Sequence, residues 1–536
     1  MSTSVVSIQQ NSTRENKSGD VKSTLEKRAS REIVIAFMGA VGCGLPRAIT
    51  ECERQLKNFG YDVVRVKLSE FLKSHKDRWA KELDPEDSGV GYLENQTIGN
   101  LFRHHYSNDI LAQYAISQVT RIKFARSKDA GDSAKELPQT AYIIDQLKHP
   151  EEANLLRLTY RNLFYLVGVL STYEHRLTRL KDGGLPVETA TRIMERDRKE
   201  SAPYGQQLEK AFKLADYFIQ HPLGLDDAIP KQVTRFLDLV HGSNAITPTR
   251  HEHAMYVAHA SGVKSACFSR QVGASILDAK GKLIAVGCND VPQYGGGLYT
   301  SENKGDQRCV NREGKFCEND KEKRLRKEKI RDGLKGDVSG IFKDAKTRLA
   351  VEQKVDEIVE LAYKYSGIPD LIEFSRAVHA EMDAIVSVAR QGGATTVGGT
   401  LYTTTFPCHN CARHIVAAGI DRVYYIEPYE KSLALTAHGD SIIVLDHDGD
   451  YSPADAINEK AENKVKFIHF AGAAPRVYSR FFQRDSRKDD FGYFVERSGD
   501  QPNSKIMVEY LDSYRDFELK VSQRFEDEFP VDATKA

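Results

Sequence analysis

The sequence is poor in the features that mark several specialised classes of protein. Its 76 basic and 76 acidic residues balance, so net charge gives no indication of a nucleic-acid or membrane partner. Eight cysteines in 536 residues are too few for a disulfide framework. The longest apolar runs, such as 164–170 and 442–445, are far shorter than the ~20 residues that span a bilayer. With 17 prolines and no internal repeat, the chain is typical of a globular protein of two or three domains.

The ends and the middle of the chain predict its organisation. Residues 1–29 are polar and lack the hydrophobic segment of a secretory signal, so we expect a flexible tail. Together with the sparse cysteines, this predicts a cytoplasmic protein that spans no membrane. Beyond the tail we predict two α/β domains, residues 30–245 and 246–500, and then a C-terminal extension, 501–536. The boundary follows a helical run at 230–239 that is broken by glycine and proline.

Two short segments of the second domain carry the groups needed for metal-assisted hydrolysis. His379-Ala380-Glu381 is followed 26 residues later by Pro407-Cys408-His409-Asn410-Cys411. The side chains of His379, Cys408 and Cys411 supply one nitrogen and two sulfur ligands. That set is typical of a catalytic zinc site, in which the fourth tetrahedral position is open to water. Glu381 is not needed as a ligand and is available for proton transfer. The pattern resembles the H-x-E and P-C-x-x-C signature of zinc-dependent nucleobase deaminases.

The local sequence predicts how these residues are held. Helical periodicity over 377–390 puts His379 and Glu381 in the first turn of a helix. A strand at 399–404 leads to a second helix at 408–418, with both cysteines near its N-terminus, where thiolates are favoured. The alternative is a closed, structural zinc site, with His409 or His414 as the fourth ligand.

The first domain begins with a strand, a glycine-rich loop and a helix. The strand at 33–38 runs into Gly39, Gly42 and Gly44, an order that suits a loop cradling phosphate groups at a helix N-terminus. A working P-loop has Lys and then Ser or Thr after its last glycine, whereas this chain has Leu45 and Pro46. We therefore predict a P-loop nucleotide-kinase-like domain with a parallel sheet. It either binds ATP, GTP or another nucleotide, or is an inactive scaffold that only packs or oligomerises.

Further features of the first domain fit this interpretation. The apolar strand at 141–145 ends in Asp145, where a Walker-B carboxylate would lie, and 164–170 is another apolar strand. The arginines that follow resemble those of a nucleotide-kinase lid. They are Arg176, Arg179, Arg192, Arg196 and Arg198.

The second domain resembles the deoxycytidylate deaminases. A helix at 250–266 and a hairpin of strands at 271–277 and 283–288 precede Gly287-Cys288-Asn289-Asp290-Val291-Pro292, similar to the Gly-x-Asn-x-x-Pro stretch of that family. The resemblance implies an α/β/α cytidine-deaminase sandwich and identifies Asn289 as a candidate for binding the sugar.

The order of domains makes the resemblance more specific. A degenerate P-loop kinase-like domain fused to this deaminase, with the segments 406–434 and 470–482, resembles bacterial anti-phage dCTP/dCMP deaminases. The resemblance implies Zn²⁺ as cofactor and depletion of the deoxycytidine nucleotide pool during infection. It also implies restraint by a small inhibitory antitoxin RNA and assembly as a homo-oligomer.

Residues 298–370 form an insertion that a minimal deaminase fold does not need. Cys309 and Cys317 within it are candidates for a second, structural metal site, with Cys288 or one of the histidines at 251, 253 and 259. The basic run at 321–335 would bind triphosphates or an RNA regulator, or would form the solvated face of a helix, which its interleaved acidic residues favour.

The sequence thus predicts zinc-dependent hydrolytic deamination of dCTP, dCMP or both. The same zinc motif also serves deaminases of tRNA or single-stranded DNA, which remain the alternative. Two other hypotheses are a nucleotide or nucleoside kinase acting through the first domain, and an RNA-sensing scaffold with a vestigial deaminase.

Overall fold

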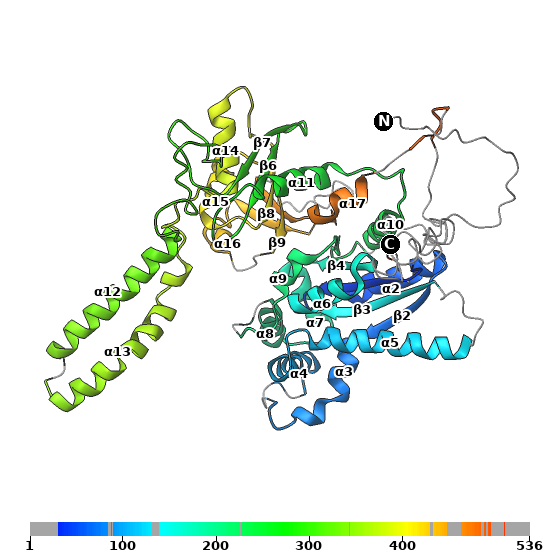
Figure 1. Ribbon diagram of the computed structural model, residues 1–536, viewed down its shortest axis with the longest axis horizontal. Helices are drawn as coiled ribbons and strands as arrows, with labels where there is room; N and C mark the ends of the chain where they lie inside the picture. The colour runs from blue at the N-terminus through cyan, green and yellow to red at the C-terminus, as the bar shows by residue number, and fades with distance from the viewer. Residues whose placement is uncertain are drawn as a thin grey trace, which may run out of the picture.

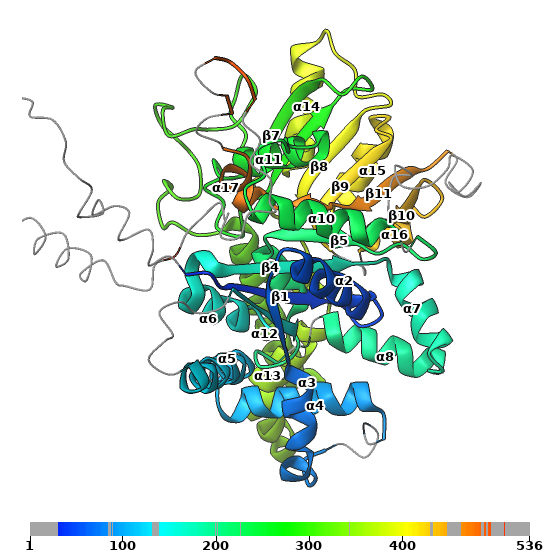
Figure 2. The same ribbon diagram turned by 90° about the vertical axis from the view of Figure 1, so that its right-hand side faces the viewer.

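The computed structural model describes residues 30–83, 87, 89–130, 139–198, 200, 202–225, 227–341, 343–428, 432–446, 463–483, 487–488, 491–494 and 509. The predicted tail, 1–29, lies outside the described residues, as does the predicted extension, 501–536, apart from residue 509. The described residues form two α/β units, each built on a six-stranded sheet (Figures 1 and 2). This confirms the predicted fold class. No helix among these residues has the length and apolar character needed to cross a membrane.

The first unit is a parallel sheet covered by helices on both faces. Its strand order is β12-β5-β4-β1-β3-β2, and all neighbouring pairs except β12–β5 are parallel. The central strands are apolar and fully buried, as expected of a sheet that is covered on both sides. The strands are β1 (Ile33–Gly39), β2 (Asp62–Lys67), β3 (Thr140–Leu147), β4 (Phe164–Leu170) and β5 (Tyr217–Gln220).

The helices of the first unit follow its strands in the alternating order of an α/β fold. They are α2 (Leu45–Asn58), α3 (Leu68–Ser74), α4 (Gly91–His105), α5 (Ile110–Ala130), α6 (Pro150–Tyr160), α7 (Tyr173–Asp182), α8 (Val187–Arg198), α9 (Leu208–Ala211) and α10 (Ala228–Val240). The consecutive helices α7 and α8 contact each other, and α8 also contacts α4 and α9 (Figure 2). The glycine-rich loop lies between β1 and α2.

The second unit is a mixed sheet between two layers of helices. Its strand order is β10-β11-β9-β8-β6-β7, in which β6 pairs antiparallel with β7 and β8, and the other pairs are parallel. Apolar residues of α11 pack on one face of the sheet, and those of α14 and α15 pack on the other. The elements are α11 (Arg250–Gly262), β6 (Gly273–Leu277), β7 (Leu283–Cys288), α14 (Ala380–Gln391), β8 (Thr400–Thr405), α15 (His409–Ala417), β9 (Arg422–Glu427), α16 (Leu433–Ala437), β10 (Ile442–Leu445) and β11 (Val465–His469).

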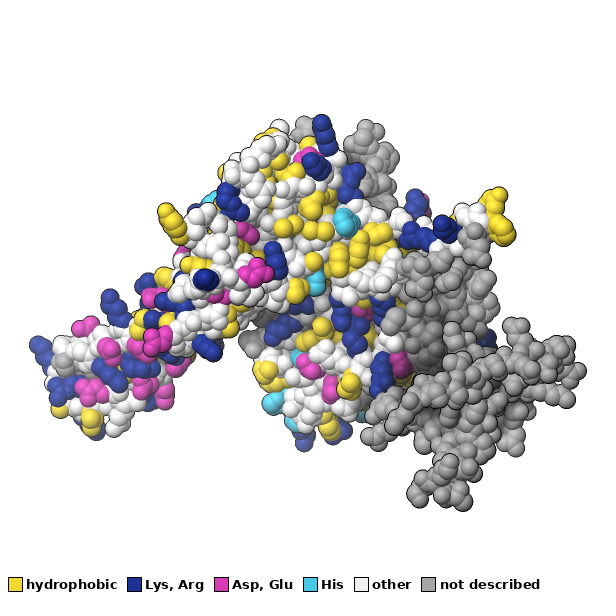
Figure 3. All heavy atoms as spheres, turned by 45° about the horizontal axis from the view of Figure 1, so that its top comes forward, with side chains coloured by type: hydrophobic (Ala, Val, Ile, Leu, Met, Phe, Trp, Pro, Cys, Tyr) yellow, Lys and Arg dark blue, Asp and Glu magenta, His cyan; other side chains and the backbone are white. Residues whose placement is uncertain are grey.

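The insertion forms a helical hairpin that protrudes from the second unit (Figure 1). Its helices are α12 (Glu318–Ile341) and α13 (Ala345–Tyr365). The basic run lies on α12 and pairs with acidic residues of α13: Arg331 lies 2.9 Å from Asp356, and Lys327 pairs with Glu360. Both signs of charge are interspersed over the hairpin surface (Figure 3). This pairing favours the solvated helix over a phosphate-binding surface.

The end of the described chain returns to the first unit. Strand β12 (Gly472–Ala473) pairs antiparallel with β5, and α17 (Tyr478–Phe482) stacks Phe481 on Tyr165, with ring centroids 6.2 Å apart. Residues 472–482, which the sequence assigns to the second domain, therefore complete the first sheet. The core of the first unit also extends to Met255 and Tyr424 of the second. The two units thus share one apolar core, and residues on both sides of the predicted boundary at 245 contribute to it.

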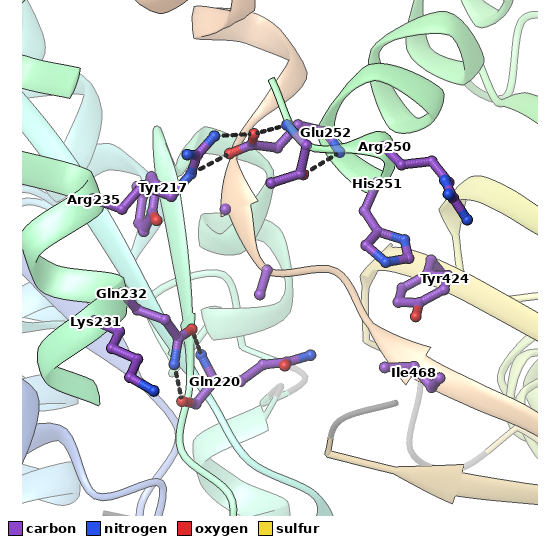
Figure 4. Close-up of a pocket in the computed structure, with 13 residues that line it drawn as sticks. Tyr217, Gln220, Lys231, Gln232, Arg235, Arg250, His251, Glu252, Tyr424 and Ile468 are labelled. Carbon is purple, nitrogen blue, oxygen red and sulfur yellow. Dashed lines mark hydrogen bonds and ion pairs between the residues drawn. The ribbon is translucent and has the colours of Figure 1, made fainter. Parts of the chain in front are cut away.

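A cavity of about 580 Å³ lies where the two units meet (Figure 4). On one side, Arg235 of α10 forms a 2.6 Å ion pair with Glu252 of α11. On the opposite side, the rings of His251 and Tyr424 lie 4.4 Å apart between centroids. Polar contacts therefore join the units beside their shared apolar core.

A second polar contact between the units is buried. The carboxylate of Asp446, directly after β10, accepts hydrogen bonds from the Thr172 backbone N–H and the His175 ring at the start of α7. Nearby, His469 at the end of β11 is fully buried, and its carbonyl accepts a hydrogen bond from the Gln220 side chain. Burial lowers the pKa of His469 to about 4.

We expect this histidine to make the protein acid-sensitive. The unfolded chain binds a proton at His469 below its ordinary pKa of 6.5, whereas the folded chain resists protonation down to about pH 4. The contribution of the neutral His469 to the free energy of unfolding is therefore fully present above pH 6.5 and is lost as the pH falls from 6.5 towards 4. The contribution lost between pH 7 and pH 5 is about 2 kcal/mol.

Denaturant unfolding at pH 7 and pH 5, for wild type and His469→Gln, measures this contribution. The free energy of unfolding of the variant should fall less between these pH values, by about 2 kcal/mol. Equal pH dependence in the two proteins would contradict the account.

Candidate active site

The three candidate metal ligands lie at the N-termini of two helices. His379 is the N-cap residue of α14, and Cys408 is the N-cap residue of α15, with Cys411 in the first turn of α15. The predicted helices begin at 377 and 408, whereas the observed ones begin at Ala380 and His409. Strand β8 leads through Phe406 and Pro407 into α15, as the order of elements predicts. Helix N-termini carry positive partial charge, which favours a thiolate at Cys408, whereas the hydrogen bond with Cys408 and burial raise the pKa of Cys411.

The donor atoms of these residues converge on one point. The Nδ1 atom of His379 lies 3.3 Å from the Sγ atoms of both Cys408 and Cys411. Among the residues that the structure describes, these three form the group whose donor atoms all lie within 4.8 Å of one another. One imidazole and two thiolates match the ligand preference of zinc and leave a coordination position for water or substrate. The residues therefore fit Zn²⁺, the cofactor predicted from the sequence.

The electrostatics of the group suit a cation. The hydrogen bond with Cys411 and the nearby His379 ring lower the pKa of the Cys408 thiol to about 4. The contact with Cys408 in turn raises the pKa of His379. A thiolate is thus present at neutral pH before any metal binds, and a cation would replace the proton that the group shares.

Glu381 lies beside the ligands and is almost completely buried. Its side chain is 4% exposed, and its Oε2 atom lies 3.5 Å from the Sγ atom of Cys411. Burial raises the pKa of this carboxyl above its usual value. A carboxyl group with a raised pKa, next to a metal site, is suited to accept and return protons.

A cavity of about 220 Å³ opens onto this group of residues. Its lining includes His379, Glu381, Cys408, Phe406 and Asn289, which brings two of the metal ligands, the buried carboxyl and the sugar-binding candidate to one place. The volume is below the ~300 Å³ at the small end of drug-sized pockets, so it suits a small ligand or one part of a larger one.

The side chain of Asn289 is held by the backbone. Its Oδ1 accepts a 2.7 Å hydrogen bond from the N–H of Val272, and its Nδ2 donates a 2.8 Å hydrogen bond to the carbonyl of Arg270. These bonds fix the orientation of the amide, and each amide atom retains one further hydrogen-bonding position. Arg270 also lines the cavity and pairs with Glu427 at 3.1 Å. No motif in the sequence marks Arg270, which lies in the turn before β6.

The two histidines considered for a closed zinc site lie outside the donor group. The ring of His414 is 2.6 Å from the carbonyl of Asn410, and His409 lies 3.9 Å from Glu373. These contacts favour the open, catalytic type of site over the structural one.

The proposed second metal site, at Cys309 and Cys317, has the thiol of Cys267 as a further neighbour. Burial raises the pKa of Cys309, and the nearby thiols of Cys317 and Cys267 add to the increase. Two of the candidate histidines are hydrogen-bonded elsewhere: His251 lies 2.8 Å from the Tyr402 hydroxyl and His253 lies 3.0 Å from that of Tyr478. The second metal at Cys309 and Cys317 stays a proposal.

In the first unit, Gly39 ends β1, and Gly42 and Gly44 follow it, each of the latter with φ of +82°. Leu45 and Pro46 begin α2, so neither place holds the P-loop lysine or hydroxyl. Asp145, the candidate Walker-B carboxylate, lies 2.7 Å from the guanidinium of Arg65 on β2. It is therefore engaged in a salt bridge with the neighbouring strand.

Part of the second unit is similar to known proteins. Residues 248–427 match the family model of the cytidine and deoxycytidylate deaminase zinc-binding region. Deoxycytidylate deaminase of enterobacteria phage T4 is 26% identical over 178 residues, covering 33% of this chain and 78% of the phage protein. ComE operon protein 2 of Bacillus subtilis is 43% identical over 56 residues, covering 10% of this chain and 29% of that protein. The matched stretch contains all three candidate metal ligands and Glu381.

Two solved structures show a weaker likeness. The dCMP deaminase of cyanophage S-TIM5, in complex with dCMP and dUMP, is 19% identical with a TM-score of 0.21, covering 36% of this chain and 93% of that one. Shikimate kinase from Acinetobacter baumannii, in complex with shikimate, is 14% identical with a TM-score of 0.23, covering 41% and 95%. At such TM-scores neither likeness supports a conclusion about function.

Proposed function

We propose that the protein catalyses the hydrolytic deamination of deoxycytidine nucleotides, converting dCTP, dCMP or both to the deoxyuridine nucleotides. The convergence of His379, Cys408 and Cys411 beside the buried Glu381 carries this proposal. The match of residues 248–427 and the likeness to a phage deoxycytidylate deaminase support the choice of substrate.

The reaction replaces the amine at C4 of cytosine with oxygen from water. His379, Cys408 and Cys411 would hold the zinc ion, which would supply a Lewis acid for the activation of water near neutral pH. Glu381 accepts a proton from the attacking water and delivers it to N3, which makes C4 electrophilic. The same carboxyl then takes the proton of the new C4 hydroxyl and passes it to the amine, so that the C4 carbonyl forms as the C–N bond breaks and ammonia leaves. Because burial raises the pKa of Glu381, the carboxyl can hold the transferred proton between these steps.

Asn289 is proposed to bind the sugar. Its amide is oriented by Val272 and Arg270, so its remaining hydrogen-bonding positions are fixed relative to Glu381. An amide that is already held in one orientation can form a hydrogen bond with a sugar hydroxyl with little loss of side-chain entropy on binding. This arrangement favours a nucleotide with its sugar placed against β6 and the base against the zinc ligands.

The wider role is proposed from the resemblance of segments 406–434 and 470–482 to anti-phage dCTP/dCMP deaminases. We propose that deamination depletes the deoxycytidine nucleotide pool during phage infection, and that a small RNA restrains the enzyme. Sequencing of RNA that co-purifies with the protein, and release of activity by ribonuclease, test the restraint. We also propose a homo-oligomer, which light scattering of the purified protein tests.

Ammonia release from separate substrates tests the proposed reaction. We expect purified, zinc-loaded protein to deaminate dCTP or dCMP at least tenfold faster than a single-stranded oligodeoxynucleotide or a tRNA. The physical reason is that a small cavity beside an oriented amide suits one nucleotide, whereas a polymer needs a groove for its flanking residues. Turnover confined to the oligonucleotide or the tRNA would contradict the proposal and favour the polynucleotide alternative.

A further inference from the structure

The glycine-rich loop of the first unit already binds an anion that the chain itself supplies. The backbone N–H of Val41 donates a 2.7 Å hydrogen bond to Oδ2 of Asp197, near the end of α8. The Nζ atom of Lys148, which follows β3, lies 2.7 Å from Oδ1 of the same carboxylate and also donates a 2.8 Å hydrogen bond to the carbonyl of Gly39. Asp197 is fully buried. An amide of the loop and a lysine thus converge on a carboxylate, where a phosphate-binding loop would hold phosphate oxygens.

The rest of the loop is tightly packed. A Cβ atom added at Gly44 would lie 1.8 Å from the ring of His221, and one added at Gly42 would lie 2.7 Å from the carbonyl oxygen of Arg176. These contacts leave no room for a side chain at Gly42 or Gly44.

A cavity of about 630 Å³ adjoins this position, and Val41, Lys148 and Asp197 are part of its wall. The cationic side chains lining it are Lys73, Arg103, Lys148 and Arg179, whereas Asp197 is the one carboxylate among the lining residues that the structure describes. Arg103 is neutralised by Glu152 at 2.7 Å, which still leaves an excess of positive charge. Apolar side chains such as Leu68, Leu72 and Leu180 line the remainder.

We propose that this cavity binds a small molecule that carries one phosphate monoester on an apolar or aromatic body, with Asp197 holding the place of the phosphate. The volume lies within the 300–1,000 Å³ range typical of pockets for such ligands. A phosphate dianion displaces the carboxylate from the Val41 N–H and from Lys148, because it carries more charge and more acceptor oxygens. The apolar body then occupies the part of the cavity lined by leucines.

Competition with an internal carboxylate has a measurable consequence. Asp197→Asn keeps the shape of the side chain but removes its charge, so a phosphate no longer displaces an anion that is paired with Lys148. We therefore expect the affinity for a phosphate monoester to increase at least tenfold. The double variant Lys148→Met/Asp197→Asn removes both charges, keeps the buried site neutral and should lose binding.

Isothermal titration of the zinc-loaded, full-length protein with AMP, dGMP and inorganic phosphate tests the proposal. Purine nucleotides are chosen because they are not substrates for cytosine deamination, so the result does not depend on the proposed activity. Asp182→Asn, an exposed substitution on α7, is the matched control and should bind as wild type does. Thermal unfolding of each variant checks that the fold is retained.

We expect Asp197→Asn to bind the monophosphates most tightly. Wild type and Asp182→Asn should bind them equally and more weakly, and the double variant should bind at least tenfold more weakly than wild type. The proposal is overturned if neither wild type nor Asp197→Asn binds any of the three probes. It is also overturned if all variants bind them equally. Should Asp197→Asn fail to fold, the comparison of wild type with the neutral double variant decides between these outcomes.

Discussion

Replacing Glu381 with alanine is expected to lower the rate of deamination by about 10³-fold while the protein keeps its zinc. The carboxyl of Glu381 is buried beside the donor atoms without being one of the three candidate ligands, and it is the group proposed to transfer protons. Without it, water must lose its proton to solvent, and neither N3 nor the departing amine receives one from the protein. Kinetic assays with dCMP and dCTP, together with metal analysis of the same samples, measure both effects.

The stability of this variant separates a catalytic from a structural role. Because burial raises the pKa of Glu381, the folded protein disfavours the charged carboxylate. Its removal should therefore leave the midpoint of thermal unfolding close to that of wild type. Glu328→Ala, on the protruding helix α12, is the matched control and should retain full activity. A Glu381→Ala protein that turns over as wild type does would remove Glu381 from the mechanism.

Replacing Cys411 with alanine is expected to abolish both zinc binding and deamination. Cys411 is fully buried, and its Sγ atom lies 3.3 Å from the Nδ1 atom of His379, so it is central to the donor group. Two ligands remain in the variant, which are too few to hold zinc against dilution or a mild chelator. We expect zinc content to fall from about one ion per chain to near zero, measured by emission spectroscopy after dialysis.

A second buried cysteine provides the control for this loss. Cys52 lies inside α2 of the first unit and is as deeply buried as Cys411. Cys52→Ala should lower the free energy of unfolding slightly, by creating a small cavity, but should retain zinc and activity. Full zinc content in Cys411→Ala would show that the metal is bound elsewhere and would contradict the assignment.

The grouping of His379, Cys408 and Cys411 beside Glu381 could be predicted from the sequence because the signals are local. His379 and Glu381 are two residues apart, Cys408 and Cys411 are three apart, and each pair lies at the start of a helix with clear apolar periodicity. Their mutual approach follows from two adjacent helices packed on one face of a sheet. The alternation of strands and helices likewise predicted the two α/β units.

The features that the sequence did not reveal depend on contacts between distant segments. Strand β12 joins β5 across about 250 residues of chain, and a two-residue strand has no periodicity to detect. Asp197 reaches Val41 across 156 residues, and a single aspartate in a helix carries no sign that it fills an anion site. For the basic run on α12, the interleaved acidic residues already favoured a solvated helix face, and its ion pairs with α13 support that interpretation.

The central claim is that the chain hydrolyses the amine of a deoxycytidine nucleotide at the site built from His379, Cys408, Cys411 and Glu381. Incubating the zinc-loaded protein with dCMP or dCTP in water enriched in oxygen-18 tests this most directly. The account predicts one ammonia per deoxyuridine nucleotide formed and one oxygen-18 atom at C4, with neither product formed by Glu381→Ala. Unchanged nucleotide after incubation with fully zinc-loaded protein, or a product formed equally by the variant, would contradict it.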